Sequence, residues 1–490
     1  MSFIVELFLV VSFFIFFFYG IVSHFSINKN FSYIFFGSYF LMLQIFVNAL
    51  LLLNITILDD VSVLNNTLLK SVHLIEFQNI IIYAFIIIIF VSYKSISNVF
   101  KINYFEYYVV LFISLVSTLT LLDSNNFILF YILIEIQSIS LYILTVFSKN
   151  SRYAIESSIK YFIMGSISSI LLLLSITFIY GLTGFFFFDD ITLYIKLFSM
   201  MKSSYTLYPV YIFTLMLLLV SLLFKMYSAP FHYWVADIYQ ASPLVSTFYF
   251  STVYLLSISY VFFTFYLSFF CFFQYFFSYI YIIMSILSIT LGTIGALTQL
   301  KIKKIIAYSS ISSCGYFLSF FIFGNNYSVS LSLNFIISYV LNLMLLFIIL
   351  INTTINKNRY INNISDFSLL YKKNFFLAIA IGIILFSISG IPSSIYFISK
   401  LHLLLNINSE YYNIYLSYLM INTIVGVMYF LQIIKIIFFE TQLEKKIIIN
   451  YSLWSYKDSF LFLIILFYNT YLSYFEEDFI FISRLLIELS

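Results

Sequence analysis

Apolar runs of about 20 residues alternate with short polar segments along nearly the whole chain. A helix of this length crosses the hydrocarbon core of a bilayer, which is about 30 Å thick. The first run is too long and too apolar for a secretory signal peptide, so we expect it to be a span. The pattern predicts fourteen membrane-spanning helices, at residues 3–23, 32–58, 77–99, 105–122, 125–147, 158–180, 206–228, 243–269, 274–298, 303–323, 328–353, 374–402, 410–439 and 455–475.

Composition supports an all-α polytopic membrane protein. Of the 490 residues, 63% are hydrophobic and 9% are charged, whereas a soluble domain is nearer half apolar and a quarter charged. The net charge of +3 gives no reason to expect nucleic-acid binding, because the charged residues lie mainly in the predicted connections. Abundant Phe and Tyr with scarce Gly and Pro indicate an AT-rich gene, as in organelles and some bacteria.

Charge in the connections agrees with the number of spans. The even-numbered connections contain only Lys70, Lys196 and Lys202 as basic residues, beside several acidic ones. The positive-inside rule therefore places the odd-numbered connections in the matrix or cytoplasm and both termini outside. Residues 192–202, in one even-numbered connection, have the pattern of a short amphipathic helix at the membrane surface. The odd-numbered connections contain Lys29, Lys101, Lys149, Arg152, Lys301, Lys303, Lys304, Lys357, Arg359, Lys372, Lys373, Lys445 and Lys446.

Two of the four prolines suggest an internal repeat. Pro230 and Pro392 each interrupt an apolar run, and they lie 162 residues and five predicted spans apart. A repeat with an odd number of helices is inverted, and paired interrupted spans in inverted repeats indicate a transport path. Alternatively, the prolines are simply tolerated in membrane helices. The repeat predicts helices 1–3 in residues 1–104, a first repeat in 105–272, a second in 273–440, and the last helix with its tail in 441–490.

A lysine accompanies each interruption. Lys225 precedes Pro230 by five residues, and Lys400 follows Pro392. A lysine at the centre of a membrane helix costs roughly 2.5–3.5 kcal/mol on insertion scales. A broken helix in lipid persists only where protein buries it or where it lines a watery cavity. We therefore expect an ion path here, although Lys225 can instead snorkel to the surface beside a proline that merely ends a helix.

Glu135 lies in the middle of a predicted span, where a lone carboxylate is protonated or paired. Its expected partner is Lys225, two spans later. Such a pair can act as a gate, because a lysine releases its proton more readily once its counter-charge has left. The alternative is a static pair that holds two helices together.

Three further residues are possible relay groups. Lys160 follows Glu156 by four residues, a spacing that equally fits an ordinary ion pair on a helix surface. His232 and His402 flank the two interruptions and titrate near neutral pH, but nearby carbonyls can also satisfy them.

The chain offers no motif for a cofactor. Cys271 and Cys314 lie far apart, which excludes an iron–sulfur centre held by this chain alone. No glycine-rich nucleotide-binding motif occurs, and four scattered histidines give no paired haem ligands. We expect no metal and no bound cofactor.

An ordered set of motifs identifies a family resemblance. The motifs are Glu156–Gly165, Tyr180–Gly184, Phe224–Trp234 with Asp237–Tyr239, Lys303–Ile311 and Gly390–Lys400. From about residue 120 to 405, the chain resembles the antiporter-like subunits of NADH:ubiquinone oxidoreductase (respiratory complex I). Pro-Phe-His-Tyr-Trp followed by Asp-Ile-Tyr resembles subunit 2, the homologue of bacterial chain N, more than subunits 4 and 5.

The resemblance implies a fourteen-helix subunit with two inverted five-helix repeats and no redox centre. It implies that the chain moves protons while other subunits, which carry FMN, iron–sulfur clusters and ubiquinone, pass electrons from NADH to ubiquinone. It further implies a mitochondrial inner-membrane location with both termini in the intermembrane space. The implied partners are lipids and other membrane-arm subunits, especially antiporter-like subunit 4 and the small membrane subunits. By motif, Glu135, Lys225 and Lys400 match the family's proton-relay residues.

The chain departs from the family pattern at two positions. Tyr254 stands where the family usually has a lysine, and Ser313 stands where it usually has a histidine. Tyr and Ser can hold a water wire but do not readily carry positive charge. Two alternatives to a proton-translocating complex I subunit therefore stay open: a cation/proton antiporter of the Mrp type, and a structural spacer that no longer pumps.

Overall fold

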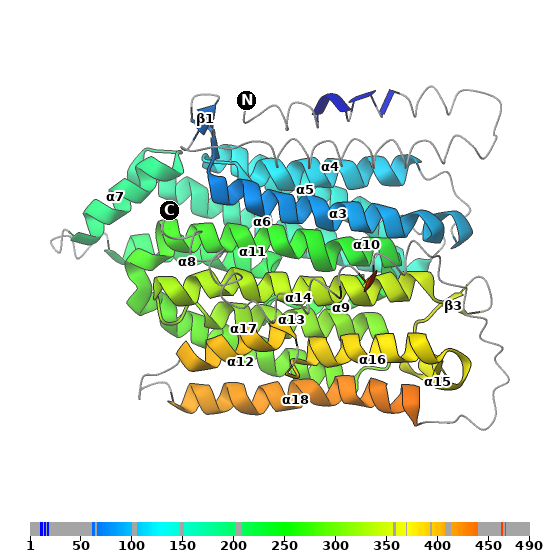
Figure 1. The fold of residues 1–490 in the computed structure, drawn as a ribbon. Coiled ribbons are helices and arrows are strands. Elements are labelled where there is room, and N and C mark those ends of the chain that lie inside the picture. The colour runs from blue at the N-terminus through cyan, green and yellow to red at the C-terminus, as the bar shows by residue number, and fades with distance from the viewer. Residues whose placement is uncertain are drawn as a thin grey trace. The chain divides into compact units, whose positions relative to one another are not determined.

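The computed structural model describes most of the chain between residues 61 and 439 (Figure 1). The predicted span at 32–58 lies outside the described residues, as do most of the spans at 3–23 and 455–475. The described residues are 10–12, 14–15, 17–18, 61–63, 66–99, 105–147, 151–200, 208–355, 359–368, 370–392, 394–406, 413–439, 462–463 and 466.

The chain divides into two compact units, which we describe one at a time. Unit 1 comprises Met1–Lys225 and Ala241–Phe273, and unit 2 comprises Met226–Gln240 and Gln274–Ser490. The two stretches of chain that form each unit are thus not contiguous in sequence.

Unit 1 is built mainly of helices. Within it, α4 packs against α5, α5 against α6, and α6 against α8. Strands β1 and β2 form a short antiparallel hairpin in which Val61 pairs with Lys70. Its elements are β1 (Val61–Val63), β2 (Leu68–Lys70), α3 (Val72–Val99), α4 (Phe105–Leu122), α5 (Phe127–Val146), α6 (Arg152–Thr183), α7 (Phe188–Met200), α8 (Tyr208–Lys225), α10 (Leu244–Tyr249), the π-helix η1 (Phe250–Tyr254), α11 (Leu255–Phe265), the π-helix η2 (Tyr266–Phe270) and the 3-10 helix η3 (Cys271–Phe273).

Unit 2 is also mainly helical. Within it, α12 packs against α13 and α18, α14 against α17, and α16 against α18. Strands β3 and β4 form a second short hairpin. Its elements are α9 (Tyr233–Ala241), α12 (Gln274–Thr298), α13 (Ile302–Ser319), α14 (Asn326–Asn352), β3 (Thr354–Ile355), β4 (Arg359–Tyr360), the 3-10 helix η4 (Ile364–Phe367), α15 (Leu370–Lys373), α16 (Phe375–Ser389), α17 (Ile395–Asn406) and α18 (Asn413–Phe438).

Most predicted apolar runs within the described residues are helices with nearly the predicted bounds. Helices α4 and α12 coincide with the predictions at 105–122 and 274–298. The predicted start at residue 158 is wrong, because α6 begins at Arg152, directly after Ser151 in an extended conformation. Its first turns are polar, so hydropathy alone missed them. The short helix predicted between two spans is present as α7, which begins four residues earlier than expected.

Both predicted interruptions are present. Helix α8 ends at Lys225, and the next helix, α9, begins at Tyr233. Helix α16 ends at Ser389, and α17 begins at Ile395. Gly390 closes α16 with a φ of 83°, a left-handed conformation that favours glycine. The helices thus end several residues before Pro230 and three residues before Pro392.

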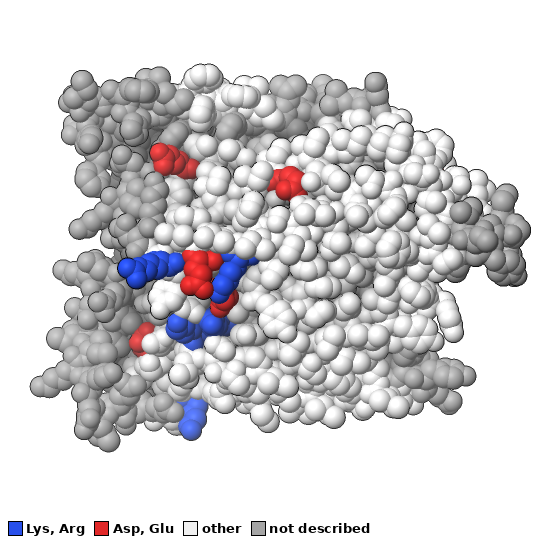
Figure 2. Space-filling view, turned by 180° about the vertical axis from the view of Figure 1, so that it is seen from behind, with Lys and Arg blue, Asp and Glu red and all other residues white. Residues whose placement is uncertain are grey.

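The helices are apolar enough for a membrane protein. Among the described residues, six helical segments are long and apolar enough to cross a bilayer, and three shorter apolar helices accompany them. Figure 2 shows one face of the molecule, where uncharged side chains cover most of the described surface and charged ones gather in a few places. The number of fourteen spans and the inverted repeats stay predictions.

Candidate functional site

Lys225 is the last residue of α8 and only 6% exposed. It makes no direct ion pair with any described residue, but the charge of Glu135 on α5 acts on its ammonium through space. One carboxylate oxygen of Glu135, Oε1, is buried and has no hydrogen-bond partner among the described residues. The predicted pair is therefore an electrostatic pair within unit 1 rather than a direct contact, which leaves both groups able to interact with water.

Tyr254 lies beside the end of α8. Its hydroxyl donates a hydrogen bond to the backbone carbonyl of Lys225 over 3.2 Å. That carbonyl belongs to the last turn of α8, where helical carbonyls lack partners within the helix. Tyr254 also ends the π-helix η1, and single π-helical turns inside α-helices are frequent at functional sites.

One polar contact close to Glu135 in the sequence was not predicted. The Gln137 side chain, two residues after Glu135, donates from Nε2 to the Ser257 hydroxyl over 3.1 Å. The bond ties α5 to α11 in unit 1, and both side chains are buried. Its only sequence signal was a buried amide in an apolar run, and nothing in the sequence identified its partner.

Lys400 lies on α17 in unit 2, five residues after that helix begins. Its ammonium lies 4.4 Å from the ring centroid of Tyr396 and 5.0 Å from that of Tyr316. Among the described residues it has no ion-pair partner. Lys400 thus lies against aromatic rings, while Lys225 is under the influence of a carboxylate.

A small polar cavity of about 10 Å³ adjoins Lys400. Hydroxyl groups dominate its lining, and two of them, on Ser309 and Tyr339, share a hydrogen bond of 3.0 Å. The hydroxyl of Tyr316, which also lines the cavity, is buried and has no partner among the described residues. The lining residues are Thr293, Ser309, Ser312, Tyr316, Tyr339, Ile388, Ser389, Tyr396, Lys400, Gly426 and Tyr429.

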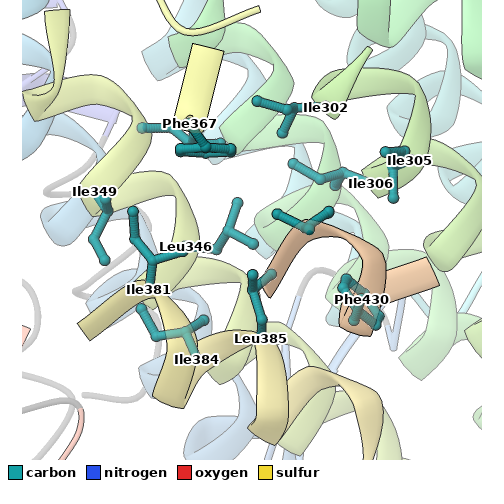
Figure 3. A pocket seen from close by; sticks show the side chains of 12 residues that line it. Ile302, Ile305, Ile306, Leu346, Ile349, Phe367, Ile381, Ile384, Leu385 and Phe430 are labelled. Atoms are coloured by element: carbon teal, nitrogen blue, oxygen red, sulfur yellow. The ribbon is translucent and has the colours of Figure 1, made fainter. Parts of the chain in front are cut away.

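A second cavity in unit 2 has a different character. It has a volume of about 20 Å³ and is lined only by aliphatic and aromatic side chains, among them Ile306, Leu346 and Phe430 (Figure 3). Apolar cavities of this kind stay dry. It is therefore a packing void, and we assign it no part in ion conduction.

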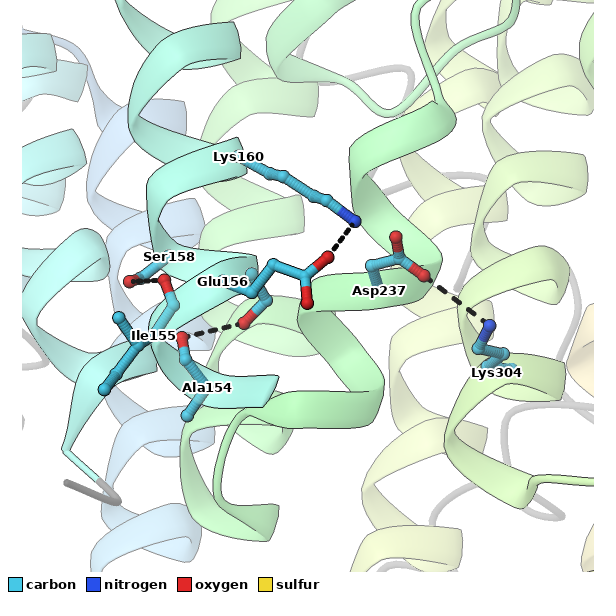
Figure 4. A network of polar contacts seen from close by, with 8 residues as sticks. Ala154, Ile155, Glu156, Ser158, Lys160, Asp237 and Lys304 are labelled. Atoms are coloured by element: carbon cyan, nitrogen blue, oxygen red, sulfur yellow. Dashed lines mark hydrogen bonds and ion pairs between the residues drawn. The ribbon is translucent and has the colours of Figure 1, made fainter. Parts of the chain in front are cut away.

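Lys160 faces outward on α6. Its ammonium lies 2.9 Å from the Glu156 carboxylate, and the two side chains are 47% and 62% exposed (Figure 4). In unit 2, Lys304 lies 3.5 Å from Asp237 in a second ion pair (Figure 4). The geometry of the first pair is the ordinary i, i+4 arrangement on a helix surface.

The two predicted histidines differ in burial. His232, between α8 and α9, is buried, stacks on Tyr233 with ring centroids 4.6 Å apart, and has no described partner at Nδ1. His402 lies on α17, two residues after Lys400, and is half-buried. The structure therefore places His232 in the interruption itself and His402 within a helix.

Ser313 is buried in α13, but its hydroxyl donates to the carbonyl of Ser310 over 2.8 Å. It does not line the cavity beside Lys400, whereas Ser309 and Ser312 on the same helix do. A relay role for Ser313 stays a prediction, and Ser309 and Ser312 are the serines of this helix that adjoin the cavity.

Comparison with known proteins identifies relatives over most of the chain. Residues 124–455 match the family described as NADH:quinone oxidoreductase/Mrp antiporter, TM. The chain is 31% identical over 361 residues to NADH-quinone oxidoreductase subunit N of Pelagibacter ubique, which covers 74% of each chain. It is 29% identical over 348 residues to NADH-ubiquinone oxidoreductase chain 2 of Marchantia polymorpha, covering 70% of this chain and 68% of that one.

Two solved structures share the fold. A chain of respiratory complex I from Thermus thermophilus matches with a TM-score of 0.75 and 19% identity over 96% of each chain. A chain of an archaeal membrane-bound sulfane sulfur reductase matches with a TM-score of 0.79 and 18% identity, over 98% of this chain and 96% of that one. At these identities the matches show the fold alone.

Proposed function

Because this chain belongs to the NADH:quinone oxidoreductase/Mrp antiporter family of membrane proteins, we propose that it is a membrane-arm subunit of respiratory complex I that translocates protons. The observation that carries this proposal is the placement of Lys225 at the end of one interrupted helix and of Lys400 near the start of another. Lys225 is buried in unit 1 and Lys400 is half-buried in unit 2, and paired interrupted helices indicate a transport path.

Each unit contributes one protonation site. In unit 1, Glu135 serves as the counter-charge of Lys225, so a proton that neutralises Glu135 weakens the attraction between the two groups and promotes proton release from the lysine. In unit 2, Lys400 exchanges its proton with the hydroxyl groups of the adjoining cavity. Electron transfer from NADH to ubiquinone takes place in other subunits, and no redox step passes through this chain.

The proposal includes a location and a topology. The proposed location, the mitochondrial inner membrane, is carried over from the family resemblance. The basic residues of the odd-numbered connections support an orientation with both termini in the intermembrane space. The separation of the two interruptions by five predicted spans supports inverted five-helix repeats at 105–272 and 273–440. The partners would be the other membrane-arm subunits, especially antiporter-like subunit 4 and the small membrane subunits, together with lipids.

Co-purification tests membership of the complex. We expect the chain, isolated from its native membrane in mild detergent, to migrate with flavin-containing and iron–sulfur subunits. A chain that migrates alone would instead support an antiporter of the Mrp type, which the family description also covers.

The spacer alternative needs a functional test, since Tyr254 and Ser313 stand where the family usually has a lysine and a histidine. In an assembled complex, Lys225→Ala should lower the number of protons translocated per electron. An unchanged ratio in a complex that still reduces ubiquinone would favour a structural spacer.

A further inference from the structure

We propose that the rings of Tyr396 and Tyr316 hold the Lys400 ammonium in place of a carboxylate, and that the adjoining cavity binds one water molecule that links this ammonium to hydroxyl groups. The inference rests on the proposed function of proton translocation and names the groups that support it in unit 2.

The two rings are placed to attract a cation. An ammonium within about 6 Å of an aromatic ring centroid is attracted by the ring, most strongly where water is excluded. Both Lys400 distances, 4.4 Å and 5.0 Å, meet this limit. Tyr396 and Lys400 are one turn apart on α17, so they share a face of that helix, while Tyr316 comes from α13. Two helices of unit 2 thus enclose one cation.

The interruption before α17 leaves room for the same side chain. A Cβ atom added at Gly390 would lie only 3.3 Å from Lys400 Nζ and 3.4 Å from its Cδ. The ammonium therefore lies beside the carboxyl end of α16, where the helix dipole favours positive charge. Gly390 serves both the left-handed turn and the close approach of the lysine.

The described residues provide no carboxylate for Lys400. Among those residues, no acidic side chain forms an ion pair with Lys400. An unpaired ammonium in a protein interior is costly. The rings and the carboxyl end of α16 reduce this cost.

The cavity provides the water site. Its volume of about 10 Å³ matches the minimum for one water molecule, about 10–15 Å³, and its lining is polar. The buried hydroxyl of Tyr316 lacks a described partner, and a water molecule in the cavity would supply one. Such a water would join Lys400 to the hydrogen-bonded hydroxyls of Ser309 and Tyr339. Because hydroxyls donate and accept hydrogen bonds but do not readily carry positive charge, Lys400 holds the charge of the bound proton until that proton is passed on.

Two substitutions at Tyr396 test the contribution of its ring and that of its hydroxyl separately. In the assembled complex in sealed vesicles, Tyr396→Phe should keep most of the proton translocation, since the ring remains. Tyr396→Leu should slow translocation through this chain about tenfold or more, because a desolvated cation–π contact is lost. Tyr275→Leu, on an exposed residue of α12 outside the cavity, is the matched control and should have no effect.

The water site is tested with Ser312→Ala, which removes one cavity hydroxyl and should slow translocation several-fold. Ser417→Ala removes a hydroxyl from an exposed position on α18 and should change nothing. Wild-type translocation in Ser312→Ala would overturn the assignment of the water site.

Lys400→Ala distinguishes failure of this inference from failure of the proposed function. If Lys400→Ala leaves the proton-to-electron ratio unchanged, the proposed role of this site in proton translocation is wrong. If Lys400→Ala lowers the ratio while Tyr396→Leu behaves like Tyr396→Phe, only the aromatic support is overturned. Should Tyr396→Leu fail to assemble, Tyr316→Leu and Tyr316→Phe give the same comparison. Loss of assembly in both leucine variants would overturn the inference in favour of a structural role for the rings.

Discussion

The surroundings of Lys225 in unit 1 and Lys400 in unit 2 differ more than their positions in the sequence suggest. Both lysines accompany an interrupted helix. Lys225 is influenced by the carboxylate of Glu135, whereas Lys400 faces aromatic rings and a cavity lined with hydroxyls. A carboxylate can be neutralised by a proton, but a ring cannot. The comparison therefore predicts that the attraction stabilising the protonated lysine can be switched off in unit 1 and is constant in unit 2.

The largest effect is expected for Lys225→Met, which removes the cation of unit 1. Loss of an acid–base group typically slows proton transfer about 10²–10⁴-fold, so transfer through this chain should nearly stop. Proton uptake by vesicles, divided by NADH oxidation, measures the loss. Lys435→Met, at an exposed position in the last turn of α18, should leave that ratio unchanged. Equal behaviour of the two variants would contradict a role for Lys225.

Glu135→Gln tests the attraction between the Glu135 carboxylate and the Lys225 ammonium, with little change in side-chain volume. At an effective dielectric constant of about 20, opposite charges several Å apart interact by about 1–4 kcal/mol, so we expect at least about a tenfold slower translocation. Glu156→Gln, on the exposed face of α6, removes a carboxylate elsewhere in unit 1 and should have little effect. A Glu135→Gln variant with wild-type translocation would remove the difference between the two lysine sites.

Gly390→Ala tests how closely Lys400 approaches Gly390 in unit 2. Alanine in the left-handed conformation at this position should cost about 1–2 kcal/mol. Its Cβ would also crowd Lys400. Gly181→Ala is the matched control, because that glycine is helical and nothing lies within 4 Å of an added Cβ. Thermal inactivation of the purified complex should occur earlier for the first variant only, and equal inactivation would contradict the close approach.

The smallest effect is expected for Tyr254→Phe, which removes the hydrogen bond to the Lys225 carbonyl. One such bond contributes about 0.5–1.5 kcal/mol, so translocation should slow only a few-fold. A loss as large as that of Lys225→Met would show that the hydroxyl itself carries protons. That result would give unit 1 a hydroxyl relay like the one proposed for unit 2.

The sequence predicted most helix positions because hydropathy is a local property. The bounds of α4 and α12 follow directly from their apolar runs, and both interruptions were predicted from a proline near each lysine. The polar first turns of α6 were missed, since an amphipathic helix start has no continuous apolar run. Local composition therefore determines which helix bounds can be predicted from the sequence and which are missed.

The surroundings of Lys400 were not predictable from the sequence for another reason. Tyr316 and Tyr396 come from segments 80 residues apart, and only packing of α13 with its neighbours brings them to one ammonium. Each is one of 44 tyrosines, so its presence alone carried no signal. The sequence likewise did not reveal that Ser309 and Ser312 line the cavity beside Lys400, because the inward face of a helix depends on the segments that pack against it.

An experimental map of the assembled complex that resolves bound water tests the central claim most directly. We predict ordered water beside Glu135 and Lys225, and one water molecule between Lys400 and the hydroxyls of its cavity. Lysines that face lipid headgroups, with dry side-chain packing around both interruptions, would contradict proton translocation by this chain.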